Sequence, residues 1–146
     1  MIRIAREAKA LLEPIAVAPP EVYVPLLKPR DADYAAVFVG DAAARARDGY
    51  ESLWANPPRS LGKHDQTNVF TFASEASQLG GENDYSVEFP GGYRKVASLF
   101  VPERVWVVWK LTVPGQTTGM RYDGLVYLGD HWAWFPKPWR IVDEVN

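Results

Sequence analysis

The sequence predicts an α+β fold in which N-terminal helices pack on a curved, cone-like antiparallel sheet. Apolar residues recur at helical spacing in the first third of the chain. The last third alternates as strands do and carries turn residues between the alternating runs. With 146 residues, an apolar fraction of 47% and a charged fraction of 23%, residues 1–146 are expected to form a single globular domain.

The N-terminal part contains two helical patterns. Residues 2–16 place apolar side chains at three- and four-residue spacing, which predicts an amphipathic helix. Prolines favour an extended segment over residues 21–30. A second helical pattern covers residues 34–54, and Gly40-Asp41 either kinks it or divides it into two helices.

The rest of the chain carries strand patterns that are separated by turn residues. The expected strands are 68–74, 85–89, 104–113, 120–128, 131–135 and 139–145. Residues 93–100 fit either a short helix or a strand. Gly129-Asp130 is a tight-turn signal, so a hairpin is expected there, within a C-terminal meander.

The expected register gives this meander two apolar faces. With Lys110 opposite Asp123, one face of the first hairpin carries no charge and must be buried. With Leu128 opposite His131, the second face becomes a plate of large aromatic groups, and a slip of one residue would exchange the faces. Its members, the expected ligand-binding or interface residues, are Trp106, Tyr127, Trp132 and Trp134. Such a face requires a ligand pocket, a partner subunit or another part of the chain to cover it.

Composition excludes several kinds of site. The net charge of −2 is too balanced for a nucleic-acid surface, and the absence of Cys removes thiolate and disulfide chemistry. His64 and His131 lie far apart without a carboxylate cluster, and no glycine-rich phosphate loop is present, so neither a metal nor a cofactor is expected. No apolar run reaches membrane-spanning or signal-peptide length, so we expect a cytoplasmic protein without membrane contact.

The stretch DHWAWFPKPWRIV, residues 130–142, ends a series of elements that resembles the NTF2-like (SnoaL-like, cystatin-like α+β cone) superfamily. The resemblance covers most of the chain in element order and, at residue level, the segment Trp139 to Val142. It implies a pocket in the mouth of a cone and dimerisation through the sheet. The family includes isomerases, dehydratases, epoxide hydrolases and non-enzymatic binding modules. The His and Asp pairs of its isomerases have no match here, and the proline-rich segment 19–29 departs from its usual start.

Three polar residues of the meander are candidates for catalysis: Asp123, His131 and Tyr122. A carboxylate beside apolar walls can have a raised pKa and act as a general base. We expect instead that Asp123 forms a structural ion pair across the sheet with Lys110 or Arg121, which lowers its pKa. His131, beside a tight turn, is expected to be solvated.

Two hypotheses about function follow. The first is a non-enzymatic, NTF2-like binding or protein-interaction domain that forms a homodimer and takes a small apolar ligand or a protein partner. The alternative is a small isomerase, lyase or hydrolase that acts on an apolar molecule in a cone-shaped pocket. In that case Asp123 is the base and Tyr122, Tyr127 or His131 assists.

Overall fold

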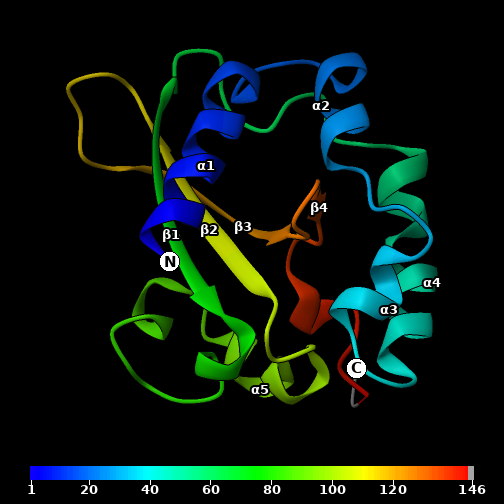
Figure 1. Cartoon of the computed structure of the whole chain (residues 1–146). Helices are drawn as coiled ribbons and strands as arrows, with labels where there is room; N and C mark the ends of the chain where they lie inside the picture. The colour runs from blue at the N-terminus through cyan, green and yellow to red at the C-terminus, as the bar shows by residue number, and fades with distance from the viewer. Residues whose placement is uncertain (145–146) are drawn as a thin grey trace.

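A computed structural model of the chain describes residues 1–144 and confirms the α+β class (Figure 1). Helices precede an antiparallel sheet with strand order β1-β2-β3-β4. The helices are α1 (Ile2–Leu12), α2 (Pro20–Leu27), α3 (Asp33–Val37), α4 (Ala42–Ala55) and α5 (Gly92–Val96). The strands are β1 (Asn68–Glu75), β2 (Val105–Thr112), β3 (Gly119–Tyr127) and β4 (Trp132–Trp134). Single turns of 3-10 helix are η1 (Glu13–Ile15), η2 (Ala76–Gln78), η3 (Ser86–Glu88), η4 (Ala97–Leu99) and η5 (Pro138–Arg140).

The first two helical patterns are confirmed in their main parts. The apolar stripe of α1 is buried at Ile4, Ala8 and Leu12, as its four-residue spacing predicts. The second pattern divides into α3 and α4 at Gly40, whose φ of +52° is a left-handed conformation that favours glycine. Within residues 1–144, no helix is both long enough and apolar enough to cross a bilayer.

Three expectations about elements are wrong, because packing and turn geometry override the local pattern. Residues 20–27 form a helix, since Pro20 occupies the first helical position, where its missing N–H costs nothing, and packing buries the helix's inner face. The segment expected as a strand over 85–89 contains η3, and the one over 139–145 contains η5, which starts at Pro138; residue 145 lies outside the described residues. Of the two alternatives for residues 93–100, the helical one is correct: residues 93–96 belong to α5 and residues 97–99 form η4.

The hairpin of β2 and β3 contains a bulge that shifts its register. Trp109 pairs with Tyr122 and Val107 pairs with Leu125, so Asp123 and Gly124 lie opposite a single residue of β2. The expected pairing of Lys110 with Asp123 is therefore wrong, and Lys110 lies opposite Arg121. The second hairpin is confirmed: the Leu128 N–H donates to the His131 carbonyl at 3.0 Å, and Tyr127 pairs with Trp132.

The bulge also places the aromatic side chains on different faces of the sheet. Trp106 packs with Phe38 and Phe100 in one cluster, which α3, α4 and α5 cover. Trp132 and Trp134 belong to the other cluster, which α1 and α2 cover. The expected common plate is wrong, because one extra residue in β3 exchanges its two faces. Another part of the same chain covers each apolar face; α1 lies along β1 and β2, while α3 and α4 stand beyond β4 (Figure 1).

Candidate functional site

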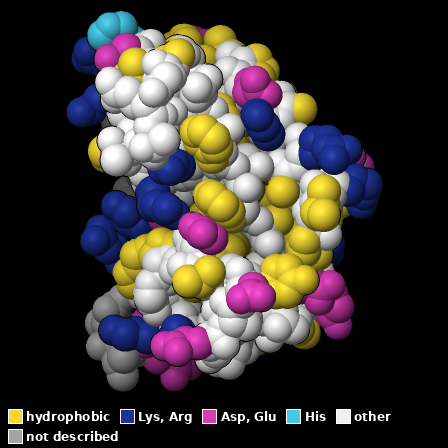
Figure 2. Space-filling view, turned by 90° about the vertical axis from the view of Figure 1, so that its left-hand side faces the viewer, with side chains coloured by type: hydrophobic (Ala, Val, Ile, Leu, Met, Phe, Trp, Pro, Cys, Tyr) yellow, Lys and Arg dark blue, Asp and Glu magenta, His cyan; other side chains and the backbone are white. Residues whose placement is uncertain are grey.

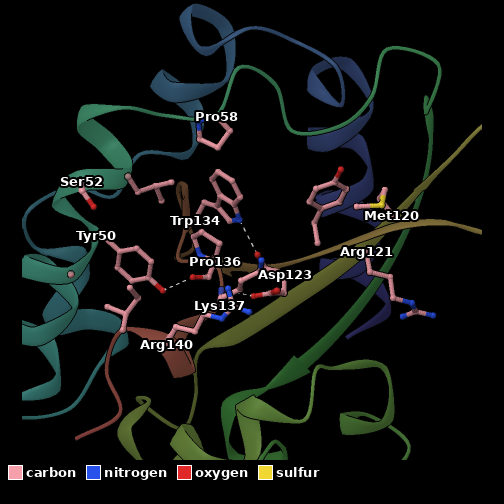
Figure 3. Close-up of a pocket in the computed structure, with 14 residues that line it drawn as sticks. Tyr50, Ser52, Pro58, Met120, Arg121, Asp123, Trp134, Pro136, Lys137 and Arg140 are labelled. Carbon is pink, nitrogen blue, oxygen red and sulfur yellow. Dashed lines mark hydrogen bonds between the residues drawn. The ribbon is translucent and has the colours of Figure 1, made fainter. Parts of the chain in front are cut away.

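A pocket of about 540 Å³ opens between α4, β3 and the chain that follows β4 (Figure 3). It exists because β4 is short and pairs only with Leu125–Tyr127, which leaves the outer edge of β3 uncovered by β4 over residues 119–123. The pocket is lined by residues of α4, by Pro58, by Met120 to Asp123 of β3 and by residues of the segment 134–141. Apolar side chains such as Leu53, Pro58 and Trp134 form much of its wall.

Among the described residues that line this pocket, Asp123 is the single acidic one, and it is only 7% exposed. The bulge at Gly124 positions it. Gly124 has a φ of +94°, and a Cβ there would lie 2.2 Å from the carbonyl oxygen of Phe135, so this position requires glycine. The close approach brings the chain after β4 against β3: the Phe135 N–H donates to the Gly124 carbonyl at 2.6 Å.

One carboxylate oxygen of Asp123 accepts two hydrogen bonds, and the other accepts none from the described residues. Oδ1 accepts hydrogen bonds from the Tyr93 hydroxyl at 2.8 Å and from the Lys137 backbone N–H at 2.7 Å. Among residues 1–144, no donor is placed at Oδ2, and this oxygen is not one of the fully buried polar atoms that lack a partner. Asp123 thus offers an acceptor oxygen to a molecule in the pocket.

Burial raises the pKa of the Asp123 carboxyl above its ordinary value. The hydrogen bonds from Lys137 and Tyr93 and the positive charges of Lys137 and Arg140 act in the opposite direction, and desolvation exceeds them. The expected lowered pKa is therefore wrong in direction, because both cations proposed as partners have other contacts. Lys110 donates to the Thr117 carbonyl at 2.7 Å, and Arg121 pairs with Glu88 at 3.2 Å.

Neighbouring side chains hold this arrangement in place. The Trp134 indole N–H donates to the Asp123 carbonyl at 2.8 Å, and the Tyr50 hydroxyl of α4 donates to the Pro136 carbonyl at 2.9 Å (Figure 3). Burial also raises the pKa of Tyr50 and of Tyr93 well above the ordinary value, and the nearby Asp123 charge adds to this effect. Both phenols therefore stay protonated and serve as hydrogen-bond donors.

A second hollow of about 280 Å³ is also lined by residues of β3. The two share Arg121, Tyr122 and Asp123, and the second one is otherwise lined by Val108, Trp109 and residues 87–90. The Arg121 guanidinium pairs with Glu88 at 3.2 Å on this side. Asp123 therefore lines both cavities.

Tyr122 lines both cavities, but its ring is stacked on Trp109 at 5.7 Å, and burial raises the pKa of its hydroxyl. His131 is not among the residues that line the main pocket. Its Nε2 lies 2.9 Å from both carboxylate oxygens of Asp33, and its Nδ1 contacts Asp130. The expectation of a solvated His131 is wrong, because this imidazole joins α3 to the β3–β4 turn. Within residues 1–144, no group of three His, Asp or Glu side chains has the arrangement of a metal site.

Of the four aromatic residues expected to bind a ligand or a partner, the structure brings one into the main pocket. Trp134, 5% exposed, is part of its wall, whereas Trp106 is fully buried in the core. The tilted rings of Tyr127 and Trp132 have their centroids 5.0 Å apart, and both residues are half-buried, with Arg3 of α1 over the Tyr127 ring. On the face shown in Figure 2, hydrophobic side chains lie between side chains of both charges.

Sequence reasoning missed Tyr50, Tyr93, Lys137 and Arg140 as members of the site. Tyr93 lies in the segment 93–100, which fits either a short helix or a strand, and Tyr50 fits the apolar spacing of the helical pattern over residues 34–54. A signal did exist for Lys137, because a lysine between two prolines has a rigid main chain.

Comparisons of the chain with protein-family models, with curated proteins and with solved structures found no match.

Proposed function

We propose that the protein binds a small, largely apolar molecule in the main pocket and that Asp123 accepts a hydrogen bond from it. The observation that carries this proposal is a buried carboxylate with one open oxygen in a cavity of about 540 Å³. That volume lies within the range of small-molecule sites, which combine apolar walls with a few fixed polar groups.

The open oxygen of this largely buried carboxyl group favours a ligand that carries a hydroxyl or amide donor. A hydrogen bond to such an oxygen becomes stronger when the ligand excludes water from the site, because polar interactions are stronger at a low local dielectric. Tyr93 and the Lys137 N–H fix the orientation of the carboxyl group through Oδ1, so Oδ2 is presented to a ligand in one direction.

A matched pair of compounds tests this function. Titration by ligand-observed NMR should give tighter binding of 2-naphthol than of 2-methoxynaphthalene, whose donor is blocked. Asp123→Asn should reduce or reverse this preference, because an amide N–H₂ then takes the place of an acceptor oxygen. Ser52→Phe places a large side chain in the pocket from an exposed position of α4 and should lower the affinity for both compounds. Asp84→Asn, at an exposed position outside the pocket, should leave both affinities unchanged. Equal affinity for the two compounds, or binding that survives Ser52→Phe, would contradict the proposal.

A second candidate is an isomerase, lyase or hydrolase in which Asp123 removes a proton from the bound molecule. The raised pKa of this carboxyl favours it, because a general base works best when its pKa approaches the working pH. Deuterium exchange at the carbons beside the carbonyl of 2-tetralone, followed by NMR in D₂O, measures such proton removal. If the wild-type protein exchanges these protons faster than buffer alone and Asp123→Asn does not, the protein is an enzyme of this kind. If the exchange rate with the wild-type protein equals the rate in buffer, binding remains the function.

The NTF2-like resemblance and a cytoplasmic location remain part of the proposal. The pocket between a bulged antiparallel sheet and α4 supports the family. Self-association also remains a prediction, and it needs a surface other than the plate expected from the sequence, because Trp106 and Trp134 are buried within their own chain. Sedimentation at micromolar concentration measures the mass, and Trp132→Lys is expected to leave that mass unchanged.

A further inference from the structure

The outer edge of β3 has no partner strand where it borders the main pocket. β4 pairs with Leu125–Tyr127 of β3, and the chain then leaves the sheet. The Phe135 N–H still donates to the Gly124 carbonyl beyond the end of β4. The next residue, Pro136, has no N–H with which to continue this ladder. β3 therefore extends past its neighbour over residues 119–123.

The backbone of this uncovered part of β3 has donors and acceptors that the chain does not use. The N–H and C=O groups of alternate residues in a strand point to opposite edges, so β2 bonds only half of them. Within residues 1–144, no hydrogen bond from outside β2 reaches the backbone of residues 120–122. The Trp134 indole takes the carbonyl of Asp123, which marks the end of the open stretch. This edge can therefore accept one more short strand.

The open edge runs along the main pocket. Four consecutive residues of β3, Met120 to Asp123, line the pocket. Successive side chains of a strand point to opposite faces, so a hollow that touches four residues in a row lies against the edge of the strand. In Figure 3, Met120 and Arg121 follow Asp123 along β3, and Trp134 and Pro58 lie above them. A strand added to this edge therefore brings one of its side chains to the pocket.

The pocket favours one kind of side chain from such a strand. Its walls include Leu53, Pro58 and Trp134, its volume is about 540 Å³, and Asp123 presents the open oxygen Oδ2. An aromatic side chain that carries an O–H or N–H, as tyrosine and tryptophan do, fills apolar space and supplies the donor. The uncovered stretch of β3 is short, which suits a peptide segment.

We propose that the free edge of β3 takes an extended peptide as an added strand, and that a tyrosine or tryptophan side chain of this peptide enters the main pocket and donates to Asp123. This inference rests on the proposed function, since it names the class of ligand for the same pocket. In strand addition, main-chain hydrogen bonds supply affinity, and pockets for alternate side chains supply specificity.

The test uses the peptide acetyl-Thr-Val-Tyr-Val-Thr-amide and two versions with a methyl group on one backbone nitrogen, either that of the tyrosine or that of the following valine. These two N–H groups point to opposite sides of an extended peptide, so only one of them can bond to β3. Calorimetric titration should show that one methylation lowers the affinity about tenfold or more, because a donor is lost and a carbonyl of β3 is left unpaired. The other methylation should lower it less than about threefold.

The side chain in the pocket is tested with a third peptide, in which phenylalanine replaces the tyrosine. It should bind the wild-type protein about three- to tenfold more weakly, because the donor to Asp123 is missing. Asp123→Asn should remove or reverse this difference. Ser52→Phe should lower the affinity for both peptides, since it occupies the pocket, and Asp84→Asn should leave both affinities unchanged.

Hydrogen exchange followed by NMR locates the added strand. With the tyrosine peptide bound, those amides of residues 120–122 that point away from β2 should exchange at least about tenfold more slowly, because a hydrogen-bonded amide exchanges only after it opens. 2-Naphthol should not slow them, since it has no backbone to pair with β3. β1 forms the opposite edge of the sheet, and its amides over residues 69–73 should keep their exchange rates.

The outcomes separate this inference from the function on which it rests. If the two methylations have equal effects, or if the peptide slows exchange at β1 and not at residues 120–122, strand addition to β3 is wrong. If the peptide does not bind but 2-naphthol binds and Ser52→Phe removes that binding, a peptide ligand is wrong and the proposed function stands. If neither the peptide nor 2-naphthol binds, both proposals fail.

Discussion

Asp123 is a carboxyl group that this fold removes from water, and its ionised form therefore lowers the stability of the folded state. In the unfolded chain it titrates near the ordinary value of 3.8, whereas burial raises the pKa in the folded protein. The folded protein then holds a proton that the unfolded chain has released. The stability that this proton contributes is complete below the unfolded pKa and is lost as the pH rises through the folded pKa.

Asp123→Asn measures this effect directly. The asparagine Oδ1 can still accept from Tyr93 and Lys137, and the side chain no longer ionises. The free energy of unfolding of the variant, relative to the wild type, should therefore increase between about pH 4 and about pH 7. Each tenfold difference in proton affinity between the folded and unfolded states corresponds to about 1.4 kcal/mol. Urea unfolding at both pH values gives the comparison, and a relative stability that decreases with pH would indicate a lowered pKa instead.

At the scale of the element, the bulge in β3 depends on glycine at one position. Gly124→Ala places a Cβ against the Phe135 carbonyl at a φ of +94°, whereas Gly129 has a similar φ of +89° and open space around it. Gly129→Ala should cost about 1–2 kcal/mol, the strain of the left-handed conformation alone. Gly124→Ala should cost at least about 2 kcal/mol more, because backbone atoms must move. Thermal or urea unfolding of the two variants tests this, and equal losses would show that the contact with Phe135 adds nothing.

At the scale of the whole molecule, His131 joins the helical part to the sheet. It contacts Asp33 of α3, a carboxylate that is 4% exposed, and Asp130 of the β3–β4 turn, which is largely exposed. His131→Ala removes one partner of the buried Asp33 carboxylate, which still accepts a hydrogen bond from the Arg30 backbone N–H at 2.8 Å. This change should lower the free energy of unfolding by about 1–3 kcal/mol. Asp130→Asn should change it by at most about 1 kcal/mol, because exposed charge pairs contribute little. If the two variants lose similar amounts of unfolding free energy, the contact of His131 with Asp33 contributes no more than an exposed charge pair does.

Much of the architecture is determined by local sequence signals. Period-two alternation locates β1, β2 and β3, and the Gly129 turn fixes the pairing of Leu128 with His131. The apolar stripe of α1 and the break at Gly40 also follow from spacing and from a single backbone requirement. These signals act over a few residues, so a single sequence is enough to read them.

The sequence by itself determined that helices precede an antiparallel sheet, that this sheet has two apolar faces, and that Asp123 is an acidic residue within a largely apolar strand. The tertiary structure alone decided which face each side chain occupies. Side chains of a strand alternate with a period of two, so the single extra residue at the Asp123–Gly124 bulge moves every later side chain of β3 to the other face. Only that shift, and the approach of Tyr93 and Lys137 from distant parts of the chain, turned an expected surface ion pair into a buried carboxylate at a pocket.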